Sequence, residues 1–297
     1  LCICSLLLSV IGLGNKWSWL KVNLHIKTIE AIPHSITLGE CLKNGPVTQV
    51  FTGVFEGIKA VIRLDLPVSQ TLGLDRFGEI ELLKFMEGST FTPKILFAAP
   101  ENGVLVWQYI PGETLDDTTT KPREITRLMG ALLADLHQLN APASQPVFSS
   151  FINRYRELLS AEMNHSMIQK GFSLFDSISH NQLPMVLSHN DINPGNLLIG
   201  EKLFIMDWEY ASLNHPYFDL ASSIENLALN KQQIKEFIQS YETSGFTVDH
   251  EELALWREFS LYLSFFWLMI IEKYATISEK EKAWMVNLEN RLSQAKG

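Results

Sequence analysis

The chain has 297 residues, 46% of them hydrophobic and 19% charged, and it carries a formal net charge of −9. This length and apolar content are sufficient for a large buried core, in one large or two modest domains. The acidic balance argues against a nucleic-acid-binding surface, which needs clustered Lys and Arg, and it favours a cationic ligand. Because Cys2, Cys4 and Cys41 all lie near the N-terminus, the sequence indicates neither a disulfide framework nor a Cys-based metal site, and a cytoplasmic location fits best.

The chain begins with an apolar segment, "LCICSLLLSVIGLG". It is shorter than the ~20 residues that a membrane-spanning helix needs. It also lacks the basic start and the small-residue cleavage site of a secretory signal. We therefore expect residues 1–30 to be a non-catalytic extension rather than an export signal or an anchor, and we expect no stable membrane insertion.

Residues 36–110 predict a small β-rich lobe. Strand-like segments separated by turns indicate a β-meander at 36–42, 49–55 and 59–66. Apolar residues at helical spacing predict one helix over 74–86. A second hairpin follows over 94–112, where Pro111 and Gly112 end the strand pattern.

The rest of the chain is mainly helical by its hydrophobic periodicity. The helical segments lie at 125–139, 151–179 and 219–295, and strand patterns return only within 185–210. The fold class predicted is therefore α+β, with the N-terminal extension at 1–30, a small β-rich lobe at 31–110 and a larger, mainly helical lobe at 111–297.

A polar loop lies between buried strand patterns in "SHNDINPGNLLI" at 188–199, and "FIMDWEY" follows it. His189, Asp191 and Asn196 lie on this loop, and Asp207 follows the next strand, so these side chains can converge. Two carboxylates and an amide oxygen are ligands that suit Mg²⁺. The pattern therefore predicts a phosphate-metal site.

Ordinary turn chemistry is the alternative, because Asp, Asn, Pro and Gly are common turn residues and a buried His is often a hydrogen-bonded core group. The combination favours the functional interpretation. The sequence HxDxxxxN is followed by a strand that ends in Asp, downstream of a β-rich lobe with an Arg on its third strand and a Glu on its helix. This ordered set resembles the kinase fold.

Three stretches carry a closer resemblance: "LSHNDINPGNLLI", "LFIMDWEYASLNHPYFDLA" and "VLVWQYIPGE". They resemble the choline/ethanolamine kinase and aminoglycoside phosphotransferase superfamily, and "MDWEYASLN" is most similar to choline kinases, including bacterial ones. The resemblance covers about residues 36–275. It implies a protein-kinase-like fold with two lobes, in which a small antiparallel β N-lobe carries one helix and a larger C-lobe is mainly helical. It also implies phosphoryl transfer from ATP with Mg²⁺, in which the lobe at 31–110 binds the nucleotide and the lobe at 111–297 carries catalysis and acceptor binding.

The resemblance assigns roles to five residues of the C-terminal lobe. Asp191 is the catalytic base or the group that orients the acceptor hydroxyl. Asn196 and Asp207 hold Mg²⁺, and together with Asp191 they form the catalytic set. His189 braces the loop, and Asp219 anchors it by accepting backbone N–H bonds.

In the N-terminal lobe, Arg63 takes the place of the lysine that protein kinases have on the third strand. A guanidinium keeps the positive charge and adds forked donors for phosphate oxygens. By the resemblance its partner is Glu79, and the backbone of Gln108 and Ile110 binds the adenine. The alternative is that Arg63 and Glu79 are solvated surface charges.

For the acceptor, the resemblance implies a small cationic alcohol, choline first or ethanolamine. The candidate contacts are Glu209, Tyr210 and Trp267. The late helix also offers four further aromatic residues, for which core packing is the alternative: Trp256, Phe259, Tyr262 and Phe266.

The chain departs from the choline kinase pattern at two positions. In choline kinases two Trp residues three positions apart close an aromatic box, whereas here Trp267 has Ile270 at that spacing. Glu225 falls about one position before the family's acidic substrate contact. Thiamine kinase and aminoglycoside phosphotransferase remain alternatives within the enzyme class. A pseudokinase scaffold that binds nucleotide without catalysis is the alternative outside it, although such proteins usually lose the base or the metal ligands.

Overall fold

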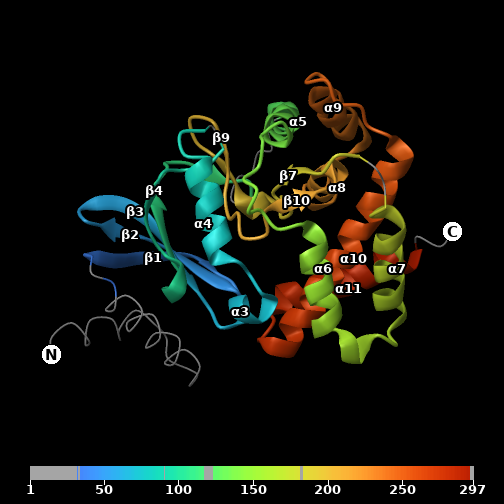
Figure 1. Cartoon of the computed structure of the whole chain (residues 1–297), viewed down its shortest axis with the longest axis horizontal. Helices are drawn as coiled ribbons and strands as arrows, with labels where there is room; N and C mark the ends of the chain where they lie inside the picture. The colour runs from blue at the N-terminus through green and yellow to red at the C-terminus, as the bar shows by residue number, and fades with distance from the viewer. Residues whose placement is uncertain (1–31, 33, 90, 117–122, 181–182, 295–297) are drawn as a thin grey trace.

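The structure is a computed structural model that describes residues 32, 34–89, 91–116, 123–180 and 183–294. A five-stranded sheet with two helices forms one part, here called the N-lobe, and the elements from β6 onward form the C-lobe (Figure 1). The proposed lobe boundary between residues 110 and 111 falls between β5 and β6. The predicted extension at residues 1–30 lies outside the described residues.

All neighbouring strands of the N-lobe sheet are antiparallel, in the order β1-β2-β3-β5-β4. Their bounds are β1 (Ile36–Asn44), β2 (Thr48–Phe55), β3 (Ile58–Asp65), β4 (Ile95–Ala99) and β5 (Val104–Gln108). The tight turn between β2 and β3 has positive φ at both Glu56 (47°) and Gly57 (79°). Two consecutive positive φ angles belong to the type I′ hairpin turn, whose twist matches that of the flanking strands.

Helix α4 (Arg76–Phe85) lies between the sheet and the C-lobe helices in Figure 1. Asp75 caps its N-terminus by accepting the Gly78 N–H at 3.0 Å. Ile80 and Leu83 are buried in the large core that the N-lobe shares with the C-lobe. A short helix that the sequence analysis did not predict, α3 (Val68–Leu72), follows β3. One turn has too few residues for a periodicity signal.

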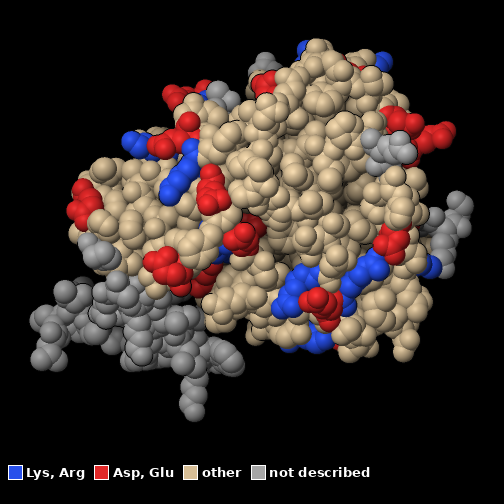
Figure 2. Space-filling model, viewed as in Figure 1, with Lys and Arg blue, Asp and Glu red and all other residues tan. Residues whose placement is uncertain are grey.

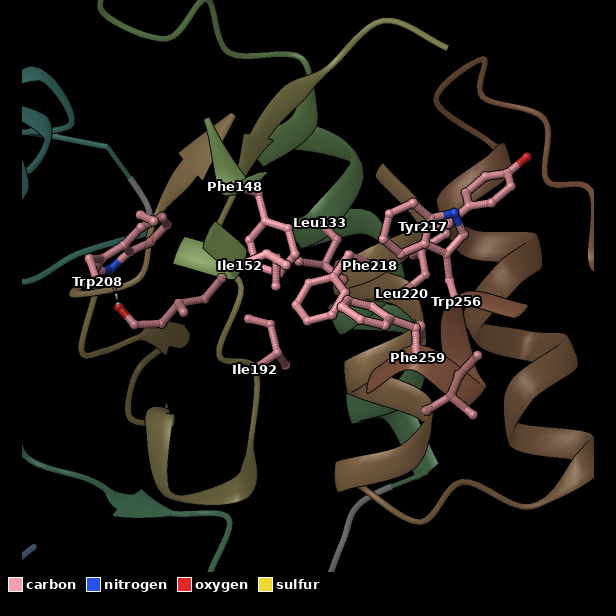
Figure 3. Packing of buried hydrophobic residues seen from close by; sticks show 14 of the residues in the cluster. Leu133, Phe148, Ile152, Ile192, Trp208, Tyr217, Phe218, Leu220, Trp256 and Phe259 are labelled. Atoms are coloured by element: carbon pink, nitrogen blue, oxygen red, sulfur yellow. Dashed lines mark hydrogen bonds between the residues drawn. The ribbon is translucent and has the colours of Figure 1, made fainter. Parts of the chain in front are cut away.

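Helices dominate the C-lobe, as the sequence predicts. They are α5 (Arg123–His137), α6 (Phe148–Leu158), α7 (Ser166–Ile178), α8 (Pro216–Asn226), α9 (Lys231–Glu242), α10 (His250–Tyr274) and α11 (Glu279–Gln294), with short 3₁₀ turns at η2 (Ser160–Glu162) and η3 (Pro194–Asn196); the 3₁₀ turn η1 (Pro100–Asn102) belongs to the N-lobe. Helix α10 packs against α7, α8 and α11. Figure 3 shows how Phe218 of α8 lies between Phe148 and Phe259, with ring centroids 4.7 and 6.2 Å away.

The short strands of the C-lobe form two separate small sheets. Their bounds are β6 (Glu113–Thr114), β7 (Val186–Ser188), β8 (Leu197–Ile199), β9 (Leu203–Ile205) and β10 (Ser212–Asn214), so β6 and β10 lie outside the 185–210 segment in which the sequence predicted strands. Strands β8 and β9 form a hairpin, which β6 extends. Strand β7 pairs instead with β10, in a separate two-stranded sheet. Three-residue strands carry too little alternation to specify a partner, because their pairing depends on contacts across the lobe.

Charges on the face shown in Figure 2 are mixed, with acidic and basic side chains interspersed over both lobes. Among the described residues, α10 is long and apolar enough to span a membrane by length and composition alone. Half of its apolar window is buried inside the protein, and core helices commonly pass the same test.

Candidate active site

The loop between β7 and β8 holds its polar side chains in one hydrogen-bonded set. Asn196 Nδ2 donates to Asp191 Oδ2 at 2.8 Å, and Asn193 Nδ2 donates to Asp191 Oδ1 at 3.1 Å. Both amides therefore turn their nitrogen atoms toward Asp191, and Asn196 keeps its Oδ1 oxygen as the acceptor or ligand atom. Burial raises the pKa of Asp191 above its ordinary value.

Asp219 of α8 anchors the start of this loop. Its carboxylate accepts the backbone N–H groups of His189 at 2.7 Å and of Asn190 at 2.8 Å, and it is fully buried. The ring of His189 spans the loop: Nδ1 accepts the Asp191 N–H at 3.2 Å, and Nε2 lies 2.9 Å from the Met206 carbonyl. Because Nδ1 accepts, Nε2 carries the proton. The two residues thus fix the backbone that leads into Asp191 and hold it against the end of β9.

Asp207 follows β9 with a φ of 63°, a left-handed conformation that is costly for a residue other than glycine. The Met206 N–H donates to the Asn196 carbonyl at 2.8 Å, which holds Asp207 beside the loop. Two cations contact its carboxylate: Lys43 at 2.9 Å and Arg63 at 3.0 Å. Although burial opposes ionisation, these cations hold the pKa of Asp207 well below its usual range.

Arg63 and Glu79 form a buried bidentate ion pair across β3 and α4, with N–O distances of 2.6 and 2.5 Å. The two residues are 3% and 5% exposed. The alternative that they are solvated surface charges is therefore wrong. A fork-to-fork pair fixes the position of both side chains, and it places the guanidinium against Asp207.

Asn196 and Asp207 offer the oxygen ligands that Mg²⁺ takes up together with phosphate oxygens and water. The ionised carboxylate of Asp207 and the uncommitted amide oxygen of Asn196 fit such an ion. In the part of the chain that the structure describes, no group of three or more His, Cys, Asp and Glu side chains could hold a metal by itself. A metal here would complete its shell with water and with the phosphate oxygens of a bound nucleotide.

The segment that joins the lobes contains Gln108 and Ile110. The Gln108 N–H donates to the Lys94 carbonyl at 2.9 Å, and the Tyr109 N–H donates to the Lys59 carbonyl at 3.2 Å. These two donors are used within the N-lobe. An adenine base would therefore have to use other backbone groups of this segment, such as those of Ile110.

A cavity of about 570 Å³ lies between the lobes beside Asp191. The turn between β1 and β2, the loop between β7 and β8, α6, α10 and α11 all contribute to its wall, and its charged lining residues are Lys43, Asp116, Asp191, Glu209, Glu225, Lys280, Glu281 and Arg291. The volume is that of a site for a small molecule.

Aromatic side chains form one wall of this cavity. Trp267 Nε1 donates to the Tyr210 hydroxyl at 3.2 Å, and Trp284 of α11 lies with its ring centroid 6.4 Å from that of Trp267. The four other aromatic residues named on α10 are buried core residues, at most 3% exposed, and core packing is the correct interpretation for them: Trp256, Phe259, Tyr262 and Phe266.

Glu209 and Glu225, two carboxylates that line the cavity, have different electrostatic surroundings. Burial, together with the charge of Asp207, raises the pKa of Glu209 to about 7. Glu225 is held by two arginines: Arg257 Nη2 lies 2.6 Å from one carboxylate oxygen, and Arg291 contacts the other. Because both of its oxygens are engaged, Glu225 is poorly placed to bind a cationic acceptor directly.

Sequence reasoning missed three residues that the structure brings to this site: Lys43, Arg76 and Trp284. Lys43 lies near the end of β1, in the stretch "KNGPVTQ", whose single glycine does not match a glycine-rich phosphate-binding motif. Arg76 lies 2.9 Å from Glu209, and Trp284 comes from α11, well after the helix that the resemblance indicated. Their partners in this site, Asp207, Glu209 and Trp267, lie more than 15 positions away in sequence, so no local pattern could have found these contacts.

A profile of the phosphotransferase enzyme family matches residues 75–256, which is well over half of the chain. The chain therefore belongs to the phosphotransferase enzyme family. The match includes α4, the catalytic loop and most of α8 to α10. Together with the fold, it confirms the predicted family resemblance.

Known proteins of similar sequence share part of their length with this chain. Protein LicA of Haemophilus influenzae is 29% identical over 145 residues, which are 43% of this chain and 54% of that protein. A probable ethanolamine kinase of Arabidopsis thaliana is 24% identical over 192 residues, covering 58% of this chain and 50% of that protein. The chain thus spans about half the length of these relatives.

The crystal structure of choline kinase LicA from Streptococcus pneumoniae has the same fold. It superposes with a TM-score of 0.73 over 93% of this chain and 98% of its own, at 19% identity. The α+β fold with a small antiparallel N-lobe and a mainly helical C-lobe is therefore confirmed, apart from the additional helix α3.

Proposed function

We propose that the protein transfers the γ-phosphate of ATP to the hydroxyl of a small cationic alcohol, with choline or ethanolamine as the acceptor. The observation that carries this proposal is the position of Asp191 in the wall of a cavity that aromatic side chains also line. Asp191 lies beside the Asn196 and Asp207 pair, so an alcohol in the cavity can meet the nucleotide phosphates there. The names of the relatives, which include ethanolamine and choline kinases, support the same acceptor class.

In the proposed reaction Asp191 accepts a hydrogen bond from the acceptor hydroxyl and orients it toward the γ-phosphate. Phosphoryl transfer has a loose transition state, so the protein acts mainly through positioning and charge neutralisation. Lys43 and Arg63 are the cations available for phosphate oxygens once a nucleotide is present. Mg²⁺, held by Asn196 and Asp207, would supply further neutralisation of the phosphate charge.

The aromatic wall supports a quaternary or primary ammonium group as the acceptor's cationic end. A quaternary ammonium has no N–H to donate, and it binds to aromatic faces at ~0.5–2 kcal/mol each, depending on desolvation. Tyr210, Trp267 and Trp284 present such faces, and Glu209 adds a carboxylate. Trp284 stands in for the second tryptophan that the sequence lacks at Ile270.

The alternatives fit less well. An aminoglycoside carries several amino groups and calls for a broad acidic pocket, whereas Glu225 is neutralised by its two arginines. A non-catalytic scaffold would have no need of a complete set of Asp191, Asn196 and Asp207. Thiamine, which is also a cationic alcohol, remains the second candidate, because the same aromatic wall would accept its rings.

The test is release of ADP from Mg²⁺ and ATP with choline, ethanolamine, thiamine and kanamycin as separate acceptors. We expect turnover with choline or ethanolamine that exceeds the background without acceptor and that is lost in Asp191→Ala. Turnover with kanamycin and with none of the other three would show that the acceptor is an aminoglycoside rather than a small cationic alcohol. No acceptor-dependent ADP release with any of the four would contradict the proposed function.

A further inference from the structure

Arg76 is a buried arginine for which the proposed reaction has no role. It is the first residue of α4 and is 8% exposed. Its guanidinium contacts three carboxylates through three different nitrogen atoms: Asp65 through Nε at 2.7 Å, Glu79 through Nη1 at 2.9 Å and Glu209 through Nη2 at 2.9 Å. Asp65 and Glu79 belong to the N-lobe, and Glu209 belongs to the C-lobe. Arg76 therefore joins the two lobes.

Glu79 is shared between two arginines. One of its oxygens accepts from Arg63, and the other accepts from both Arg63 and Arg76. Arg63 also lies 3.0 Å from Asp207. A continuous chain of ion pairs therefore runs from Glu209 through Arg76, Glu79 and Arg63 to Asp207. In a buried network each contact is strengthened by the low dielectric, so a change at one end alters the balance at the other.

The two ends of this series of ion pairs face different ligands of the proposed reaction. Glu209 lines the cavity proposed for the acceptor, and Arg63 and Asp207 form the proposed nucleotide-phosphate and metal site. Glu209 is 8% exposed, and its Oε2 atom, although 2.9 Å from Arg76, makes no aligned hydrogen bond with any described residue. A buried carboxylate oxygen without an aligned donor leaves capacity for a further partner.

We propose that Arg76 is a positioning residue that couples the two binding sites, so that a bound nucleotide strengthens the binding of the cationic acceptor. The proposal rests on the function proposed above. When nucleotide phosphates attract Arg63, Glu79 loses part of its pairing and Arg76 shifts its interaction toward Glu79. Glu209 is then released from Arg76 and becomes available to the acceptor cation. The coupling is reciprocal, because it is a property of the two binding free energies.

The test measures the dissociation constant of choline by titration calorimetry on the full chain, with and without saturating Mg²⁺ and the non-hydrolysable analogue AMP-PNP. We expect choline to bind the wild-type protein at least about fivefold more tightly when the analogue is present, the lower end of typical coupling. In Arg76→Met that ratio should fall to about one while the analogue still binds. Arg127→Met, at an exposed arginine of α5, is the control and should keep the wild-type ratio.

A second variant guards against misfolding, because Arg76→Met leaves three buried carboxylates without this partner. Glu209→Gln removes only the carboxylate charge that faces the acceptor cavity, so Arg76 keeps its ion pairs with Asp65 and Glu79. The ratio of the choline dissociation constants without and with the analogue should again fall to about one. A wild-type ratio of one, or a ratio that is unchanged in Glu209→Gln, would overturn the coupling. The proposed function has a separate outcome. It is contradicted if the wild-type protein binds the analogue but neither binds nor phosphorylates any tested alcohol. Turnover together with a ratio of one between the two choline dissociation constants contradicts only the role of Arg76.

Discussion

Asp191 and Asp207 are carboxylates of one site, but their surroundings give them different chemistry. Asp191 accepts hydrogen bonds from two neutral amides, whereas Asp207 contacts two cations. The first environment suits a group that takes a hydrogen bond from an alcohol. The second keeps a carboxylate ionised, as a metal ligand must be.

Asp191→Ala is expected to lower kcat by ~10²–10⁴, the usual contribution of a positioned base. Nucleotide binding should be retained, because the hydrogen bonds and ion pairs that hold Lys43, Arg63 and Asp207 in the described part of the chain do not involve Asp191. Asp207→Ala should weaken Mg²⁺-dependent nucleotide binding as well. Steady-state kinetics and nucleotide titration separate the two effects. Wild-type turnover in Asp191→Ala would refute the assignment of the base.

The tryptophan pair gives a second test at the residue scale. Trp267→Ala and Trp284→Ala should each raise KM for choline more than KM for ATP, because cation–π contacts act on the acceptor in both ground and transition states. Trp284→Phe keeps an aromatic face and should recover most of the affinity. Trp256→Ala, which empties a core site, should instead lower stability. If Trp284→Ala changes neither KM, α11 plays no part in acceptor binding.

Local motifs predicted the part of the site in which sequence neighbours act together. His189, Asp191 and Asn196 lie on one loop, and Asp207 follows the adjacent strand, so a hairpin brings them together. Arg63 and Glu79 required the family resemblance, because an Arg on a strand and a Glu on a helix have no local signature. Lys43, Arg76 and Trp284 escaped prediction, since their partners are chosen by the packing of the two lobes and of α11.

At the scale of elements, α8 depends on an unusual cap. His215 is the N-cap residue, and its Nδ1 accepts the Tyr217 N–H at 3.2 Å. This bond requires an unprotonated Nδ1. Burial lowers the pKa of His215 to about 4, even though Glu252 lies 3.2 Å from Nε2. Because α8 carries Asp219, the state of this cap also bears on the catalytic loop.

Stability should therefore fall as pH drops from about 6.5, the ordinary pKa of histidine in the unfolded chain, toward about 4. In that window the unfolded state binds a proton that the folded state does not, so folding is penalised at the lower pH. His215→Asn keeps a capping oxygen but does not titrate. Urea unfolding at several pH values should show that the free energy of unfolding decreases less for the variant than for the wild type as the pH is lowered. Equal slopes would mean that His215 does not titrate differently in the two states.

The close contact of α7 with α10 is set by a glycine. A Cβ atom on Gly171 would lie 2.4 Å from Phe266 Cζ and 2.8 Å from Tyr262 Cβ. Gly171→Ala should therefore destabilise the fold by ~1–3 kcal/mol through overpacking, despite the better helix propensity of alanine. Ser173→Ala, on the exposed face of the same helix, is the control for propensity. A stabilised Gly171→Ala variant would show that the two helices can separate at little cost.

The helices and the N-lobe meander were predictable because long periodic segments carry many consistent signals. The pairing of β7 with β10, the strand β6 and the helix α3 were not. Each is five residues or shorter, so its conformation is fixed by neighbours from distant parts of the chain rather than by its own composition.

At the scale of the whole molecule, the site lies where the two lobes meet. Lys43 and Arg63 belong to the N-lobe, and Asp207 belongs to the C-lobe. Three charges from two lobes lie in contact before any ligand binds. A ligand that engages both lobes replaces or completes these contacts, and it should therefore stabilise the folded protein as a unit.

Mg²⁺ and ATP together should raise the midpoint of thermal unfolding, because a ligand that binds only the folded state adds RT ln(1 + [L]/Kd), or about 2.7 kcal/mol at 100 times Kd. ATP in the presence of EDTA should raise the midpoint less, since the metal links the phosphates to Asp207. In Asp207→Ala the difference in unfolding midpoint between ATP with Mg²⁺ and ATP with EDTA should largely disappear. AMP lacks the outer phosphates, so its effect on the midpoint should depend little on the metal in either protein. Differential scanning fluorimetry at matched ionic strength measures all of these midpoints. An equal rise with Mg²⁺ and with EDTA in the wild-type protein would show that ATP binds without a metal at Asp207, and the metal assignment would then fail.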